Sequence, residues 1–126
     1  MGVSLDGPRP VGRPLFLFRI AILVGCTGAL AALSWLPAKA VTRTMLGGHA
    51  EHLIAWMGAA VVIGWTFSRR RRLAVQAVLL IAYAAILEAG QLYAIGRHAS
   101  LQDFAFSAAG VVLGAAAVLI VQRSRA

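Results

Sequence analysis

The sequence predicts an all-α integral membrane protein: a four-helix bundle with both termini in the cytoplasm. The first observation is composition, because hydrophobic residues make up 60% of the 126 residues and charged residues only 13%. Soluble domains carry about 25% charged residues, and disordered chains need low hydrophobicity, so both classes are excluded. The second is a series of four apolar stretches, each near the ~20 residues that cross a bilayer as a helix. The third is an uneven distribution of Lys and Arg around them.

The four spans belong to one domain, residues 1–126. They are expected at about residues 15–36, 48–68, 73–93 and 102–121. Transmembrane β-strands are disfavoured, because these stretches do not alternate polar and apolar residues.

Local signals mark the ends of the spans. Leu36-Pro37 ends the first helix, since proline disfavours helix in the residue before it. Gly47-Gly48 is a helix-breaking pair before the second span. Ser100 lies three residues before Asp103, which resembles a capping box with Asp in place of Glu. The fourth helix is therefore expected to begin just after Ser100.

The first span also has features of a signal peptide. Arg13 precedes the apolar run, and Ala38-Lys39-Ala40 resembles a cleavage site. The apolar run exceeds 20 residues, however, whereas the apolar core of a signal peptide usually has about 7–15. We therefore expect this segment to remain as a membrane-spanning helix.

The basic residues predict the orientation of the chain. With four spans, the N-terminus, the connection between the second and third spans and the C-terminus share one side. That side holds nine of the 12 basic residues, namely Arg9, Arg13, Arg19, Arg69, Arg70, Arg71, Arg72, Arg123 and Arg125. The positive-inside rule places it in the cytoplasm, and we expect a bacterial inner membrane. The net charge of +8 is thus attributed to topology, and no nucleic-acid partner is expected.

The polar residues that can carry chemistry gather on the opposite, outer side. They are all three histidines and three of the four acids: His49, His52, His98, Glu51, Glu88 and Asp103. Between His52 and the arginine run lie 16 residues, which cover roughly 24 Å as a helix. Between that run and Glu88 lie 15 residues, or roughly 22 Å. Because the hydrocarbon core is about 30 Å thick, His52 and Glu88 are expected some ~6–8 Å inside the outer boundary, where an ionisable side chain indicates a functional site.

Helical spacing predicts which of these side chains share a face. Gln91 lies three positions after Glu88, and His52 lies three positions after His49, so each pair shares a helical face. One stripe on the fourth span consists of Asp103, Ser107, Gly110 and Gly114. Its small residues allow close backbone approach, so we expect this stripe to face the bundle. The purely structural interpretation is that these polar side chains form a clasp, that is, interhelical hydrogen bonds that only hold the helices together.

A metal site is the weaker interpretation of the histidines. His49-Ala50-Glu51-His52 superficially resembles the H-E-x-x-H motif of zinc proteases, but those histidines are four residues apart and the Glu stands elsewhere. We predict no metal site, and the sequence identifies no cofactor.

Two segments resemble the VanZ-like family of membrane proteins. The segment from Gly48 to Trp56 is similar to the family's histidine segment, although Gly48 and His49 stand where the family often has Asp-Lys. The second segment is similar to the family's signature, which consists of E-x-x-Q, then R, then D-x-x-x-N-x-x-G. The matching residues are Glu88, Gln91, Arg97, Asp103, Ser107 and Gly110. Ser107 replaces the usual Asn. The likeness covers about residues 45–118, and the four-span layout also matches.

The resemblance implies a role in the cell envelope, since the family takes its name from a protein linked to glycopeptide resistance. It also implies processing of phosphate-containing lipid or lipid-linked head groups at the outer leaflet. The candidate catalytic residues are His52, Glu88 and Asp103. His52 is the general base or nucleophile, and Glu88 or Asp103 orients it. The candidate substrate-binding residues are Arg97, as a phosphate clamp, with Gln91, His49, Glu51 and Ser107.

Two other functions remain open. One is a non-catalytic protein that binds membrane lipids or lipid-linked envelope precursors and modulates the envelope or glycopeptide resistance. The other is a small transporter, which is disfavoured because the polar residues lie on one side only. The sequence does not determine the oligomeric state.

Overall fold

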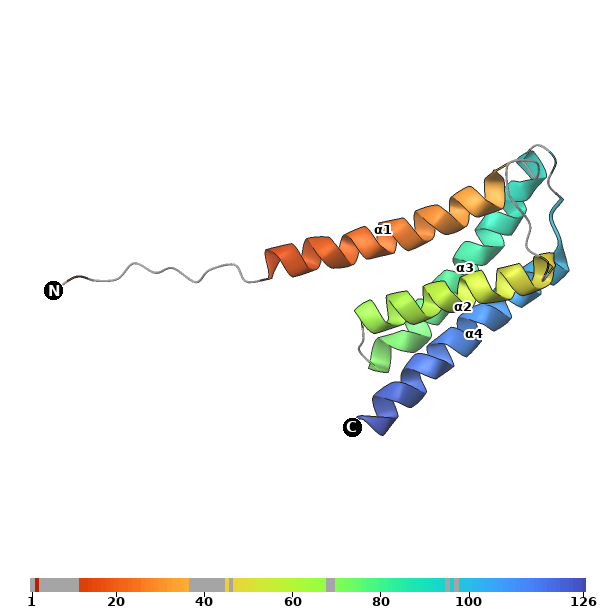
Figure 1. Cartoon of the computed structure of the whole chain (residues 1–126). Coiled ribbons are helices and arrows are strands. Elements are labelled where there is room, and N and C mark those ends of the chain that lie inside the picture. Colours follow the sequence, from red (N-terminus) through yellow and green to blue (C-terminus); the bar gives the residue numbers. More distant parts are fainter. Residues whose placement is uncertain are drawn as a thin grey trace.

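The computed structural model describes residues 2, 12–36, 45, 47–67, 70–94, 96 and 98–126. Within these residues the chain is all-helical (Figure 1). The elements are α1 (Arg13–Trp35), α2 (Gly48–Thr66), the 3₁₀ turn η2 (Arg70–Arg72), α3 (Leu73–Gly90), the 3₁₀ turn η3 (Gln91–Tyr93) and α4 (Leu101–Ser124). Each predicted span coincides with one α-helix, and the last helix extends three residues beyond its predicted end.

The predicted helix ends are confirmed at three places. Leu36 follows the last residue of α1 and has an extended backbone, with φ −61° and ψ 143°. Gly47 precedes α2 with φ 86°, a left-handed conformation that glycine adopts without steric cost. The Ser100 side chain accepts a hydrogen bond from the Asp103 N–H at the start of α4. The local sequence signals therefore decide where these helices begin and end.

Three of the described helical segments are long and apolar enough to cross a membrane. They are Arg13–Trp35, Arg70–Tyr93 and Leu101–Ser124. Because such segments are typical of proteins that cross bilayers, the chain is assigned as an integral membrane protein. The α2 helix is not among the three; its first five residues include two histidines and a glutamate, which lower its mean hydropathy.

Successive helices run in opposite directions. Along α2 and α4 the contacts advance together, from Leu53 beside Gly110 to Gly64 beside Val118, so these helices are parallel. Along α2 and α3 they advance in opposite senses, from Trp56 beside Tyr83 to Gly64 near Leu73, so this pair is antiparallel. In Figure 1, α1 runs in the same general direction as α3. This alternation is the arrangement that successive membrane crossings require.

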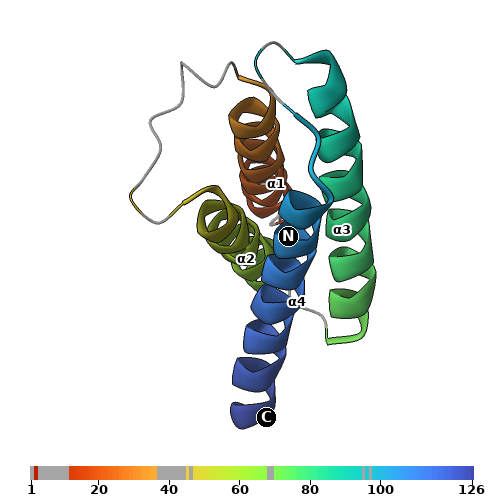
Figure 2. The ribbon, with the colours of Figure 1, turned by 90° about the vertical axis from the view of Figure 1, so that its right-hand side faces the viewer.

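The closest helix contact is between α2 and α4. A Cβ atom on Gly110 would meet the Leu53 carbonyl oxygen, and one on Gly114 would lie 2.6 Å from the Met57 carbonyl oxygen. The predicted small-residue stripe therefore does face a neighbouring helix, and its glycines let the two backbones meet. Figure 2 shows α4 beside both α2 and α3.

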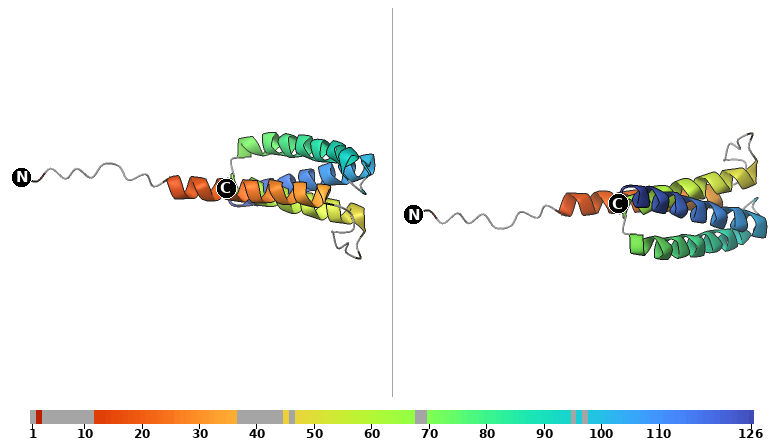
Figure 3. Two further views of the ribbon diagram at one scale, coloured as in Figure 1. Left: turned by 90° about the horizontal axis from the view of Figure 1, so that it is seen from above. Right: turned by 90° about the horizontal axis from the view of Figure 1, so that it is seen from below.

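The α1 helix joins this unit mainly through its C-terminal half. The Trp35 Nε1–H donates to the Leu87 carbonyl at 3.1 Å, and the Tyr83 hydroxyl donates to the Thr27 carbonyl at 2.7 Å. The N-terminal residues 15–18 are more than half exposed, and this part of α1 extends beyond the other helices (Figure 3). The described part of the chain is thus a compact α2–α3–α4 unit with α1 attached along part of its length.

The two ends of this unit differ in charge. We call one the arginine end, where the described residues Arg70, Arg71, Arg72, Arg123 and Arg125 lie. We call the other the histidine end, where α2 and α4 begin and α3 ends; it carries His49, His52, Glu88, Ser100, Asp103 and Ser107. The polar asymmetry of the sequence is therefore also an asymmetry between the two ends of the folded unit.

Candidate functional site

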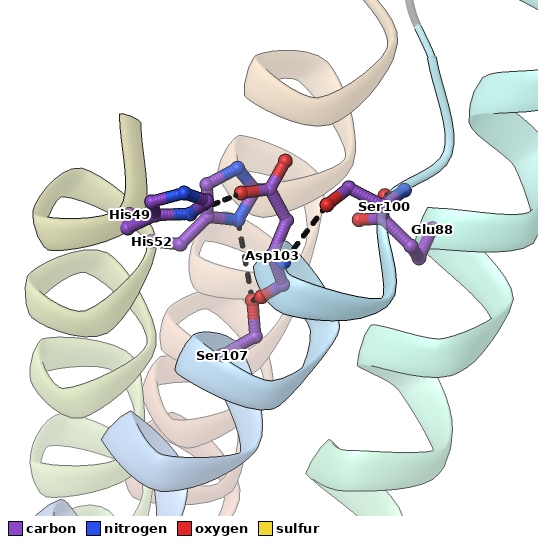
Figure 4. Close-up of polar contacts among 6 residues, drawn as sticks. All are labelled: His49, His52, Glu88, Ser100, Asp103 and Ser107. Atoms are coloured by element: carbon purple, nitrogen blue, oxygen red, sulfur yellow. Dashed lines mark hydrogen bonds and ion pairs between the residues drawn. The ribbon is translucent and has the colours of Figure 1, made fainter. Parts of the chain in front are cut away.

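Two histidines of α2 face two polar residues of α4. His49 Nδ1 lies 2.8 Å from Asp103 Oδ1, and His52 Nδ1 lies 3.2 Å from Ser107 Oγ (Figure 4). Both pairs follow from the parallel register of α2 and α4, because residues three or four apart on a helix share one face. The close approach at the glycines one turn further along α4 brings the two faces within hydrogen-bonding distance.

The hydrogen bonds determine which nitrogen of His52 carries the proton. The single Ser107 hydroxyl proton is donated to the Asp103 carbonyl at 2.9 Å. Ser107 Oγ must therefore accept from His52, so Nδ1 carries the hydrogen in the neutral ring. The Nε2 lone pair of His52 is then available to accept a proton or to attack an electrophile.

His49 is also held through its Nδ1 atom, in this case by the Asp103 carboxylate. An ionised Asp103 only accepts hydrogen bonds, so His49 Nδ1 is the donor and Nε2 keeps its lone pair. The ring also stacks on Phe106, with ring centroids 4.9 Å apart and an interplanar angle of 17°. The His49 side chain is 50% exposed and that of Asp103 23% exposed. A carboxylate that orients an accessible imidazole through Nδ1 is the arrangement of many acid–base catalysts.

Asp103 is held by the beginning of its own helix. Its N–H donates to the Ser100 hydroxyl at 3.3 Å, and its carboxylate lies in the first turn of α4. The positive end of the helix dipole favours a negative charge there by about 0.3–1 kcal/mol. The cap and the start of the helix thus place this carboxyl group at the histidine end, next to His49.

Glu88 occupies the other side of the α4 N-terminus. Its Oε1 accepts a hydrogen bond from the Ser100 N–H, and the residue is only 9% exposed. A carboxylate in the last turn of α3 is disfavoured by the dipole of that helix, and the bond from Ser100 offsets this. Figure 4 shows Glu88 and the two histidines on opposite sides of the first turn of α4. Glu88 thus connects to the histidines through Ser100 and Asp103.

The structure brings the predicted site residues together only in part. His52 was expected to be oriented by Glu88 or Asp103, but its Nδ1 contacts Ser107, and Asp103 contacts His49 instead. The reason is register: Asp103 lies one turn before Ser107 on α4, as His49 lies one turn before His52 on α2.

Of the other predicted residues, Gln91, Ser107 and Glu51 are also at this end. Gln91 is 2% exposed in η3, and Ser107 is equally buried. Glu51 is partly buried in the first turns of α2. Arg97, the predicted phosphate clamp, lies outside the described residues. Ser100 and Phe106 were not predicted as site residues; Phe106 lies three residues after Asp103 and so on nearly the same helical face.

In the described part of the chain, no group of three or more His, Cys, Asp or Glu side chains is arranged to hold a metal ion. The single free cysteine among these residues, Cys26, lies in α1, packed against the core.

No protein-family model, no curated protein and no solved structure matches this chain. The likeness to VanZ-like proteins is therefore carried by the motif residues alone and stays a prediction.

Proposed function

We propose that the chain is a VanZ-like inner-membrane protein that crosses the bilayer four times and processes phosphate-containing head groups at its histidine end. In this proposal α2 is the remaining span, both termini are cytoplasmic, and the histidine end faces the outer leaflet. The alternating helix directions support four crossings, and the arginine end supports the orientation through the positive-inside rule. The substrate is a membrane lipid or a lipid-linked envelope precursor.

The His49–Asp103 pair is the observation that carries the catalytic part of this proposal. It joins an accessible imidazole to an orienting carboxylate at 2.8 Å, next to a second imidazole held by Ser107. As a purely structural clasp, a pair exposed to this extent contributes little stability, since exposed ion pairs contribute about 0–1 kcal/mol. General acid–base catalysis by such groups contributes roughly 10²–10⁴ in rate.

The division of roles follows from the free nitrogens. His52 Nε2 acts as the general base on an attacking water or alcohol, or itself attacks phosphorus. His49, charged after accepting a proton and stabilised by Asp103, donates that proton to the leaving oxygen or binds a phosphate oxygen. Arg97, which precedes α4 in the sequence and lies outside the described residues, is proposed to bind the phosphate. Glu88 positions Ser100, the N-cap residue of α4, through their hydrogen bond.

A binding protein without turnover is the second candidate. It is favoured by the Glu88–Ser100 contact, which joins the end of α3 to the start of α4 as a structural clasp would. In that case the histidine end recognises the same head groups but does not alter them.

Lipid extracts analysed by mass spectrometry test the proposal. Cells with and without the protein are compared, together with cells carrying Asp103→Asn and His52→Ala at matched membrane levels. The matched control is His98→Ala, because His98 lies at the same end but is an exposed loop residue. We expect a lipid change that depends on the protein, is lost in the two site variants and survives in the control. A change that survives in Asp103→Asn contradicts the catalytic proposal.

A further inference from the structure

The arginine end carries a concentrated positive charge. Arg70, Arg71 and Arg72 form η2 directly before α3 and are all exposed. Arg123 and Arg125, also exposed, end α4. A Cβ atom on Gly64 of α2 would lie 3.2 Å from the Leu73 side chain and 3.3 Å from the Val118 side chain. Leu73 directly follows the first group and Val118 lies five residues before the second, so both groups are at the same end of the unit.

The described part of the chain places no Asp or Glu side chain among these arginines. Its acids Glu51, Glu88 and Asp103 belong to the histidine end, and Asp6 lies outside the described residues. Five exposed guanidinium groups therefore have no Asp or Glu side chain of the described helices beside them.

An aromatic side chain marks the depth of this end. Trp65, near the end of α2, is 48% exposed. The Arg125 guanidinium lies 5.1 Å from the Trp65 ring centroid, within cation–π distance. Tryptophan is enriched where a membrane meets water, so the arginines next to it lie at the level of lipid head groups.

We infer that the arginine end is a binding surface for anionic phospholipid head groups. Guanidinium groups bind phosphate oxygens through two parallel hydrogen bonds, and basic residues next to a membrane attract anionic lipids. The partner is a lipid and not a soluble phosphate ester, because Trp65 and the exposed apolar residues Val62 and Val75 place acyl chains beside the same end. This inference is independent of the chemistry proposed for the histidine end.

Tryptophan quenching by brominated lipids tests this surface at one end of the molecule. Trp35→Phe with Trp56→Phe leaves Trp65 as the reporter of the arginine end. Trp56→Phe with Trp65→Phe leaves Trp35, beside Gly90 at the opposite end, as the matched control. The full chain is reconstituted in mixtures of unlabelled phosphatidylcholine with dibrominated phosphatidylglycerol or dibrominated phosphatidylcholine. Circular dichroism confirms that each variant is helical.

At low salt we expect Trp65 to report a preference for phosphatidylglycerol of about fivefold or more, the attraction of at least one basic residue. The preference should fall in 0.5 M salt, because salt screens exposed charges. It should approach parity when all five described arginines of this end, Arg70, Arg71, Arg72, Arg123 and Arg125, are replaced by Gln, and survive when all five are replaced by Lys. The Trp35 reporter should show no such preference.

Three results overturn the inference. The first is equal quenching of Trp65 by the two lipids at low salt. The second is a preference that is the same at Trp35 or that persists in the Gln variant. The third is loss of the preference on adding millimolar glycerol 3-phosphate, which would show a site for free phosphate esters.

Discussion

Gly110→Ala tests whether the α2–α4 contact positions the histidines. A Cβ atom at this position would lie 3.0 Å from the Met57 backbone nitrogen and still nearer the Leu53 carbonyl oxygen. Both are backbone atoms of α2, so the helices must separate by at least 0.4 Å for the Met57 contact to reach the ordinary 3.4 Å. The same separation moves His52 Nδ1 from 3.2 Å to about 3.6 Å from Ser107 Oγ, where no hydrogen bond remains.

The expected cost of this substitution is about 1–3 kcal/mol, the usual range for overpacking a close contact. The matched control is Gly58→Ala on α2, where a Cβ would meet nothing within 4 Å. Replacing a glycine inside a helix without a clash is expected to stabilise by about 0.5–1 kcal/mol. The two alanine variants should therefore differ in unfolding free energy by about 1.5–4 kcal/mol.

Reversible unfolding in detergent micelles, followed by circular dichroism, measures both variants. The lipid analysis proposed for the histidine end is run in parallel on cells that contain the same amount of each. Gly110→Ala should lose both stability and the lipid change, whereas Gly58→Ala should keep both. A Gly110→Ala protein as stable as Gly58→Ala would refute the close α2–α4 packing from which the site is built.

Three further predictions concern other contacts. Glu88→Gln should leave the fold intact, because the amide oxygen still accepts from the Ser100 N–H. If the lipid change also survives at matched membrane levels, Glu88 is a positioning residue only. Complete loss of the lipid change would instead assign chemistry to the Glu88 carboxylate. Tyr83→Phe removes the hydrogen bond to the Thr27 carbonyl and should lower the unfolding free energy by about 0.6–2 kcal/mol, and an unchanged unfolding curve would contradict a role in attaching α1. Arg70→Cys, in a background without the native cysteine, should resist an impermeant thiol reagent in intact cells and react after lysis; labelling of intact cells would reverse the proposed orientation.

Much of the fold was predictable because its signals are local. A proline after Leu36, a glycine before α2 and a serine at the start of α4 act through the backbone of their own neighbours, and the structure confirms all three. The hydrophobic segments were predictable for the same reason, since their length and composition alone mark them as able to cross a bilayer. The sequence also predicted that the stripe through Ser107 and Gly110 faces another helix, because helical periodicity places these residues on one face.

The partners across that face were not predictable. Helical spacing groups His49 with His52 and Asp103 with Ser107, but it does not determine how far α2 is displaced along α4. The glycine contacts determine that register, and a displacement by one turn would pair different side chains. For this reason Glu88 or Asp103 was expected beside His52, whereas Ser107 contacts His52 and Asp103 contacts His49.

The attachment of α1 is a second feature that only the tertiary structure decides. By itself the sequence determined that α1 is an apolar helix long enough to span a bilayer, and that the histidines and most acids are separated along the chain from most of the arginines. Apolar length does not determine how much of a helix is buried, because in a lipid environment an unpacked apolar face carries no hydrophobic penalty. Burial there depends on specific contacts, and for α1 the described contacts include two hydrogen bonds to backbone carbonyls and the packing of its C-terminal half.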